Sequence, residues 1–266
     1  AYDLPIALSI MHASEQVEMP ALANFVIMGE LALDGILRPI KGALAMVMEA
    51  KKQGFTKIIL PRANAMEAAM IEGMDVFGME TLPETVLFLR GKSVHHPQPT
   101  TKPLVHAHDD GLDFSHVHGQ KIAKRAFEIA AAGGHNLILI GPPGAGKTML
   151  AKRIPSILPP LSLEEAMETT IIHSVAGKIV QNSQLIASRP FRAPHHSISS
   201  TALIGGGSNP QPGEISLAHN GVLFLDEMPE FSRHALEVMR QPLEDHLVLI
   251  SRAKWSIEFP ANFMLI

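Results

Sequence analysis

The stretch GGHNLILIGPPGAGKTMLAKRI, residues 133–154, joins an apolar run to a helix-like segment through a turn rich in glycine and proline. Within it, residues 141–148 fit the pattern G-x-x-x-x-G-K-[ST] of a phosphate-binding loop. Glycines let backbone N–H groups curl around phosphate oxygens, and the amino end of the next helix adds partial positive charge. The pattern requires a strand before the turn and a helix after it. We therefore predict a strand over 136–140 and a helix over 148–154.

The chemistry of such a loop assigns a role to each of its last two residues. Lys147 would reach the β- and γ-phosphates of a nucleotide, and the Thr148 hydroxyl would ligate Mg²⁺. ATP and Mg²⁺ are therefore the expected cofactors. The predicted nucleotide-binding residues are Gly141, Pro142, Pro143, Gly144, Ala145, Gly146, Lys147, Thr148 and Met149.

A second element supports hydrolysis rather than simple binding. The run GVLFLDE, residues 221–227, is an apolar strand that ends in two carboxylates. Asp226 is placed to hold the Mg²⁺ shell together with Thr148, and Glu227 to orient and polarise the attacking water. The predicted catalytic residues are Lys147, Asp226 and Glu227.

Composition limits the remaining possibilities. The 266 residues carry a formal net charge of −4, so any contact with nucleic acid has to be a local patch. Cysteine is absent, which excludes disulfides and thiolate metal sites. No apolar run approaches the roughly 18 residues of a membrane span, and no secretory signal is visible. A cytoplasmic protein is expected. Both ends fall inside apolar segments, so we expect a fragment of a longer chain.

Helix-like and strand-like stretches alternate along the chain, which predicts an α/β fold in two domains. We expect a first domain over 1–92, a linker over 93–112 and a second domain over 113–266. The linker is rich in proline and histidine. A solvated linker is the favoured interpretation and a metal site remains open, because the linker and its flank hold His95, His96, His106, His108, His116 and His118.

Three blocks make a family resemblance specific: residues 119–162, RPFRAPHHSISSTALIGGG at 189–207 and PGEISLAHNGVLFLDEMPEF at 212–231. They resemble the YifB/ComM family, magnesium-chelatase-like AAA+ ATPases of bacteria. The resemblance implies an AAA+ domain over 113–266, incomplete at its carboxyl end. It also implies an insert in the second helix, roughly residues 176–215, with a strand pair at 177–190.

The same resemblance implies a ring, expected to be a hexamer, with ATP at the subunit interfaces. Residues 114–120 stand where the family packs near adenine, although His118 replaces an expected aliphatic residue. In the FRAPHH block, the adjacent His195 and His196 are expected to point in different directions. Arg192 and this histidine pair are expected to line the insert or the subunit interface.

The amino-terminal zone resembles the Lon-protease-like domain of the same family, through YDLPIALSIMHAS at 2–14 and the segment 29–55. Lon enzymes use a Ser–Lys dyad. Here Leu44 takes roughly the place of the lysine, and Lys41 lies three residues earlier. We therefore expect a degenerate domain that acts as a scaffold or interaction module and not as a protease.

One basic segment offers a DNA contact. HLVLISRAKWSIEFP, residues 246–260, predicts two alternating strands around a tip that contains Arg252 and Lys254. It resembles the hairpin that faces the channel of MCM helicase rings. Six copies in a ring would gather about twelve positive charges against phosphates. Trp255 is expected either to stack on a base or to join the core.

Three functions remain open from the sequence. The family resemblance favours a DNA motor, a helicase or translocase in recombination or in the processing of DNA taken up by the cell. The first alternative is a magnesium-chelatase-type motor subunit. The second is a non-motor nucleotide-binding regulator, which the Asp226–Glu227 pair disfavours.

Overall fold

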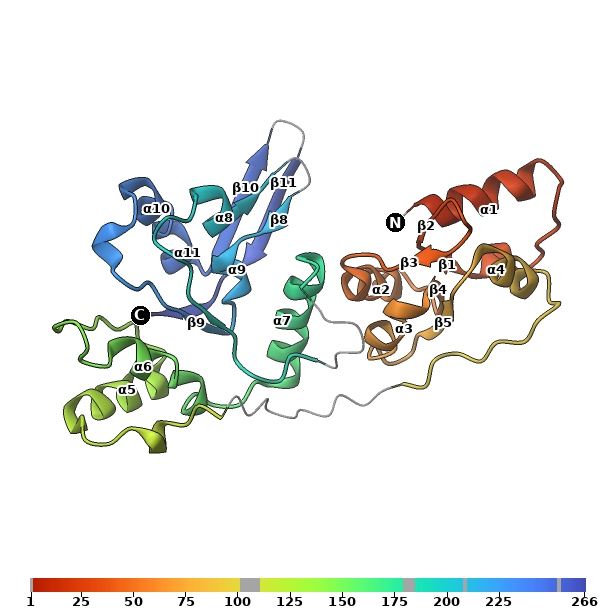
Figure 1. Ribbon diagram of the computed structural model, residues 1–266. Coiled ribbons are helices and arrows are strands. Elements are labelled where there is room, and N and C mark those ends of the chain that lie inside the picture. The colour runs from red at the N-terminus through yellow and green to blue at the C-terminus, as the bar shows by residue number, and fades with distance from the viewer. Residues whose placement is uncertain (1, 101–110, 179–184, 208–209, 253–254) are drawn as a thin grey trace. The chain divides into compact units, whose positions relative to one another are not determined.

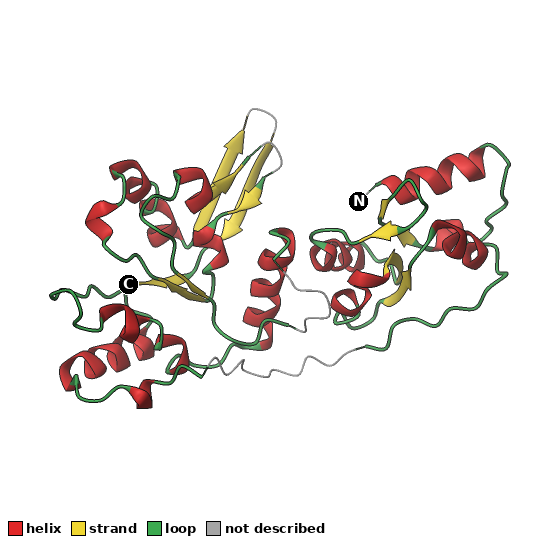
Figure 2. Cartoon of the chain, in the orientation of Figure 1, coloured by secondary structure: helices red, strands yellow, loops and turns green. Residues whose placement is uncertain are grey.

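The computed structural model describes residues 2–100, 111–178, 185–207, 210–252 and 255–266. The chain divides into two compact units, and both are α/β (Figures 1 and 2). Unit 1 comprises residues 1–104 and 173–185, and unit 2 comprises residues 105–172 and 186–266. Among the described residues, no helix combines the length and apolar character that crossing a membrane requires.

Unit 1 is built on three parallel strands in the order β1-β4-β5, with a short antiparallel pair, β2–β3, beside α1. The alternation of helix and strand predicted over 43–91 is confirmed. The apolar residues 58–60 are fully buried in the central strand, as a strand covered on both faces requires. The elements are α1 (Asp3–Ala13), η1 (Leu22–Asn24), β1 (Val26–Ile27), β2 (Glu30–Leu31), β3 (Leu37–Arg38), α2 (Ala43–Lys52), β4 (Lys57–Pro61), α3 (Arg62–Ala68), β5 (Asp75–Met79) and α4 (Leu82–Leu89).

A buried carboxyl group lies within unit 1. Glu67 of α3 is only 8% exposed and accepts a hydrogen bond from Asn64 Nδ2 at 2.6 Å and another from the Ser174 hydroxyl at 3.3 Å. Asn64 also bonds the backbone N–H and C=O of Ile40, both at 2.9 Å. Burial raises the pKa of Glu67, and the two side-chain hydrogen bonds offset that rise only in part.

This raised pKa makes the stability of the protein depend on pH. The folded state holds the Glu67 proton more tightly than the unfolded state does, so stability present at pH 4 is lost as the pH rises through the folded pKa. Relative to Glu67→Gln, the wild type should lose stability between pH 4 and pH 7.5. Urea unfolding at several pH values measures this, with Glu18→Gln as an exposed control. A constant difference between wild type and Glu67→Gln would contradict it.

Unit 2 contains a parallel sheet in the order β12-β9-β6 and two antiparallel hairpins, β7–β8 and β10–β11 (Figure 1). Its core gathers apolar side chains from the helices and the central strand, including Phe127, Leu150 and Phe224. The elements are η2 (Phe114–His116), α5 (Lys121–Gly133), α6 (Lys147–Ala151), η3 (Ile154–Ser156), α7 (Leu163–Val175), β6 (Phe191–Arg192), α8 (Ser200–Ile204), β7 (Gly205–Gly206), β8 (Gln211–Pro212), α9 (Glu214–Leu217), β9 (Gly221–Leu223), η4 (Met228–Glu230), α10 (Arg233–Glu237), α11 (Arg240–Asp245), β10 (Leu247–Arg252), β11 (Trp255–Pro260) and β12 (Phe263–Leu265).

The strand predicted over 136–140 is not formed. This segment makes one backbone hydrogen bond to the sheet, from Leu137 N to Leu265 O at 2.9 Å. Ile138 and Ile140 are 73% and 90% exposed. A strand requires a ladder of such bonds, and a single bond at the edge of β12 does not make one. The prediction of a strand over 136–140 is therefore wrong, although the segment makes this one contact with the edge of the sheet.

The strand pair predicted at 177–190 within the insert is only partly described. The described part of 177–190 contains no strand, and residues 179–184 lie outside the described residues. The hairpin is β7–β8, which separates the short helices α8 and α9. Gly205 permits this turn because its φ is +112° and a Cβ there would overlap the carbonyl oxygen of Gln211.

The segment 233–245 precedes the predicted hairpin, and its sequence predicts one helix, but the structure has two helices there, α10 and α11. Pro242 explains the interruption, since a proline lacks the N–H of a helix interior and its ring conflicts with the carbonyl four residues earlier. The predicted hairpin that follows is confirmed: β10 and β11 pair antiparallel from Leu247–Pro260 to Arg252–Trp255.

Candidate functional site

The phosphate loop follows the segment 136–140 and ends on Thr148, the second residue of α6 (Lys147–Ala151). Gly144 and Gly146 have φ of 78° and 83°, a backbone region that favours glycine. Gly146 is the residue immediately before α6. The motif therefore has the turn geometry that lets backbone N–H groups face an anion.

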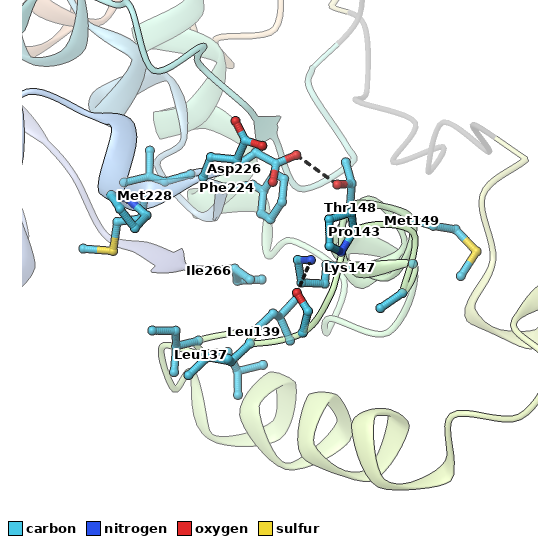
Figure 3. Close-up of a pocket in the computed structure, with 18 of the residues that line it drawn as sticks. Leu137, Leu139, Pro143, Lys147, Thr148, Met149, Phe224, Asp226, Met228 and Ile266 are labelled. Carbon is cyan, nitrogen blue, oxygen red and sulfur yellow. Dashed lines mark hydrogen bonds between the residues drawn. The ribbon is translucent and has the colours of Figure 1, made fainter.

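Lys147 folds back over this loop. Its Nζ donates a hydrogen bond to the carbonyl oxygen of Gly141 at 2.8 Å (Figure 3). It donates a second to the carbonyl oxygen of Pro142 at 3.0 Å. The ammonium group thus lies at the mouth of the loop. There it can exchange these carbonyl partners for the oxygens of a bound phosphate, which form stronger charge-assisted bonds.

The acidic residues predicted after β9 meet the phosphate loop. Thr148 Oγ1 donates a hydrogen bond to Asp226 Oδ2 at 2.9 Å, although the two residues are 78 positions apart (Figure 3). A hydroxyl and a carboxylate are both hard oxygen donors of the kind that Mg²⁺ prefers. These residues fit a Mg²⁺ ion that carries nucleotide phosphates, and such an ion would neutralise charge on the phosphates during transfer.

Glu227 follows directly and is exposed to solvent. Its backbone is left-handed, with φ 55° and ψ 49°, at the residue that precedes η4. Glu230 N donates to the Glu227 carbonyl at 2.8 Å, which fixes this turn. A left-handed glutamate is uncommon, and this strained position lies directly beside Asp226, the predicted Mg²⁺ ligand.

One pocket of about 1180 Å³ joins these parts. Its lining contains Lys147, Asp226 and Glu227, all the predicted catalytic residues. All the predicted nucleotide-binding residues line it except Pro142, whose carbonyl instead accepts the bond from Lys147. Apart from Asn136, the remaining lining residues are apolar, including Phe224, Leu265 and Ile266. The pocket is somewhat larger than the roughly 300–1,000 Å³ of typical small-molecule sites.

Residues 113–266 match the family model for magnesium chelatase, subunit ChlI, and residues 1–64 match a second model, subunit ChlI of Mg-chelatase. YifB of Escherichia coli K12 is 48% identical over 269 residues, which is 100% of this chain and 52% of YifB. The competence protein ComM of Haemophilus influenzae Rd is 44% identical over 271 residues, with the same two shares. The chain belongs to the magnesium-chelatase-like YifB/ComM family.

This chain spans about half the length of the curated YifB and ComM relatives that it matches. A shorter similarity, 33% over 81 residues, links 30% of it to 17% of the DNA repair protein RadA of Escherichia coli K12. Among solved structures, this chain resembles a complex of subunits BchI and BchD of magnesium chelatase. That likeness has a TM-score of 0.47 and 21% identity, over 58% of this chain and 53% of the other.

The blocks that distinguish the YifB/ComM family form internal contacts that sequence reasoning missed. Arg192 of the FRAPHH block pairs with Glu214 of the PGEIS block through two hydrogen bonds, Nε–Oε2 at 2.5 Å and Nη2–Oε1 at 2.7 Å. This bidentate ion pair is half-buried. It holds the amino end of α9, the helix that follows the β7–β8 hairpin, against β6. The sequence offered one signal for this pair, namely a basic residue, Arg192, in one block and an acidic residue, Glu214, in the other.

The histidine pair of this family member also differs from expectation. The rings of His195 and His196 do not point apart, because their centroids lie 4.0 Å from one another. His196 also contacts the ring of Phe231 edge-on. A turn after β6 brings the rings together, with His195 Nδ1 2.8 Å from the Ser197 hydroxyl. The described residues contain no group of three His, Asp or Glu side chains arranged for a metal ion.

The remaining predicted sites are only partly described. Lys254, His106 and His108 lie outside the described residues. For Arg252 the structure gives the backbone pairing with Trp255 at the end of the hairpin. In the segment expected near adenine, Phe114 and Val117 are buried in the core of unit 2 and His118 is exposed. The adenine contact stays a prediction.

Proposed function

We propose that this chain is the nucleotide-hydrolysing part of an Mg-ATP-driven ring motor, expected to be a hexamer, that acts on DNA. The observation that carries hydrolysis is the Thr148–Asp226 contact at 2.9 Å, which joins the phosphate loop to an acidic pair at one pocket. Binding alone would need the loop but not Glu227 beside Asp226.

The choice of DNA rests on two relatives and one hairpin. ComM is named as a competence protein and RadA as a DNA repair protein, and the RadA name points to DNA. The β10–β11 hairpin ends at the pair Arg252–Trp255, so Arg252 of the predicted tip stands at the end of the hairpin, whereas Lys254 lies outside the described residues. The magnesium chelatase models favour a second candidate, a motor subunit that drives metal insertion into a porphyrin. Stimulation of ATP turnover by DNA separates the two candidates.

The amino-terminal part has a different proposed role. We propose that residues 1–92 form a Lon-like domain and that residues 93–112 form a linker after it. Leu44, which takes the place of the catalytic lysine, is fully buried in α2, and Lys41 is exposed outside that helix. Neither residue supplies a base for a serine nucleophile. This part is therefore proposed as a scaffold and not as a protease.

The hairpin tests the DNA assignment. Arg252→Ala combined with Lys254→Ala should remove most affinity for DNA and leave ATP binding unchanged. The salt dependence of the remaining affinity should fall by roughly 0.7 in log K per log salt for each lost contact with a single strand. Fluorescence anisotropy of the full-length protein with single-stranded and forked DNA measures both quantities.

A matched control removes the same charge elsewhere. Lys121→Ala with Arg125→Ala deletes two exposed cations of α5, and DNA affinity should change little. Equal affinity and equal salt slope for the hairpin variant and the wild type would reject the hairpin as the DNA contact.

A further inference from the structure

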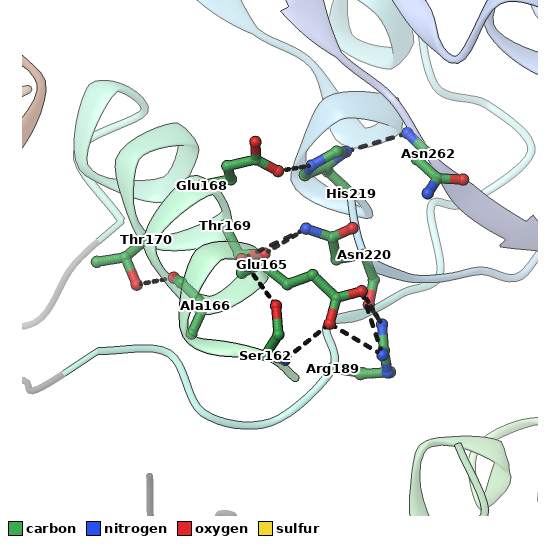
Figure 4. Close-up of polar contacts among 10 residues, drawn as sticks. All are labelled: Ser162, Glu165, Ala166, Glu168, Thr169, Thr170, Arg189, His219, Asn220 and Asn262. Atoms are coloured by element: carbon green, nitrogen blue, oxygen red, sulfur yellow. Dashed lines mark hydrogen bonds and ion pairs between the residues drawn. The ribbon is translucent and has the colours of Figure 1, made fainter. Parts of the chain in front are cut away.

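The turn between α9 and β9 is held by a dense polar network in unit 2 (Figure 4). Its residues, His219 and Asn220, belong to the PGEISLAHNG block, and both are buried. They contact α7 on one side and Asn262, the residue before β12, on the other. The nucleotide pocket uses neither residue.

His219 is fixed in one tautomer. Its Nδ1 accepts the backbone N–H of Asn262 at 3.0 Å, so the proton lies on Nε2, which faces Glu168 Oε2 at 3.3 Å. The side chain is only 5% exposed, and burial lowers the pKa of the ring. A neutral ring keeps the Nδ1 lone pair that this contact needs.

Asn220 binds the other backbone group of Asn262, its carbonyl. Its N–H donates to the Asn262 carbonyl at 2.6 Å, from a left-handed backbone with φ 58°. Its side-chain amide donates to the Glu165 carbonyl at 3.3 Å and to Thr169 at 3.4 Å. The Asn220 carbonyl accepts from Arg189 at 2.8 Å, which also pairs with the Glu165 carboxylate. Both hydrogen-bonding groups of the Asn262 backbone are therefore taken by this turn.

Asn262 leads into the strand that connects both halves of the nucleotide site. On one side β12 pairs with β9, in the register Phe263–Gly221 to Leu265–Leu223. On the other side, Leu265 accepts from Leu137 N at 2.9 Å and donates to Asn136 Oδ1 at 2.8 Å. β9 leads to Asp226 and residues 136–140 lead to the phosphate loop. A shift of β12 along its axis would therefore move both Asp226 and the phosphate loop.

We infer that His219 and Asn220 are positioning residues for ATP hydrolysis, because they fix β12 and β9 in the register that aligns the phosphate loop with the Asp226–Glu227 pair. They act from the amino ends of the strands, while the reacting groups lie at the carboxyl ends. This inference rests on the proposed ATPase function and adds two residues that no nucleotide-binding motif contains.

Two substitutions of His219 separate positioning from packing. His219→Leu fills similar space but leaves the Asn262 N–H without an acceptor, whereas the Oδ1 of His219→Asn can replace Nδ1. In the full-length protein, His219→Leu should lower kcat about tenfold or more, as misplacement of reacting groups does. ATP affinity should stay within a few-fold, and His219→Asn should recover most of kcat. Glu168→Gln, which keeps a hydrogen-bond acceptor for Nε2, should stay close to wild type.

Hydrogen exchange gives a second measurement that does not depend on turnover. In His219→Leu, the amides of Asn262, Leu265 and Leu137 should exchange faster, while those of unit 1 stay unchanged. Faster exchange with lower kcat supports the inference. Unchanged exchange overturns it, as does a kcat within twofold of wild type or a fall in kcat that only matches a loss of folded protein. If the wild type shows no ATP turnover, the proposed function fails, and exchange alone still tests the register.

Discussion

Glu227→Gln is expected to lower kcat for ATP hydrolysis by roughly 10²- to 10⁴-fold, the usual contribution of a general base. The amide has the shape of the carboxylate but cannot accept a proton from water. Because Thr148 and Asp226 keep their contact, Mg-ATP affinity should stay within a few-fold of wild type. Steady-state turnover and titration with a fluorescent ATP analogue measure the two effects separately.

The chain offers a matched control for this change. Glu230 is an exposed glutamate three residues further on, in η4, and it does not line the pocket. Glu230→Gln should therefore leave kcat near the wild-type value. If Glu227→Gln hydrolyses ATP within twofold of wild type, Glu227 is not the residue that activates water.

Lys147→Ala is expected to have the largest effect on binding. The ammonium group lies at the mouth of the phosphate loop, within 2.8 Å of the Gly141 carbonyl. A hydrogen bond to a charged group contributes about 1.5–3 kcal/mol. Loss of contacts to the β- and γ-phosphates should thus weaken ATP binding by roughly 10- to 100-fold or more. AMP, which lacks both phosphates, should bind the variant and the wild type alike.

Lys152→Ala is the control, because it removes an exposed lysine from the carboxyl end of α6 without touching the pocket. Fluorescent-analogue titrations of both variants give the comparison. If wild type and Lys147→Ala bind ATP with equal affinity, the assignment of residues 141–148 as the phosphate-binding loop is contradicted.

The nucleotide site could be predicted because its signals are local. A turn of glycines before Lys147 and a buried strand before Asp226 each require only a few neighbouring residues, and the chemistry then implies that they meet. The structure brings Thr148 and Asp226 to 2.9 Å. The hairpin β10–β11 could likewise be predicted, because two alternating segments that are close together in the sequence are a short-range pattern.

The remaining features depend on contacts that are distant in sequence. Nothing near His219 indicates that Asn262, 43 residues later, occupies its Nδ1. The apolar run at 136–140 has the sequence pattern of a strand, yet it makes a single backbone hydrogen bond to the sheet, at Leu265. Whether such a run pairs as a strand depends on the position of the neighbouring strand and not on the run itself. Periodicity also concealed the break before Arg240, where one proline outweighs the helical pattern on either side.

ATP turnover by the full-length protein, measured with Mg²⁺ in the presence and absence of single-stranded DNA, tests the central claim most directly. We predict turnover that requires Mg²⁺, rises when DNA is added and disappears in Glu227→Gln. Turnover that DNA leaves unchanged, or that survives in Glu227→Gln, would contradict the account of an ATP-driven motor acting on DNA.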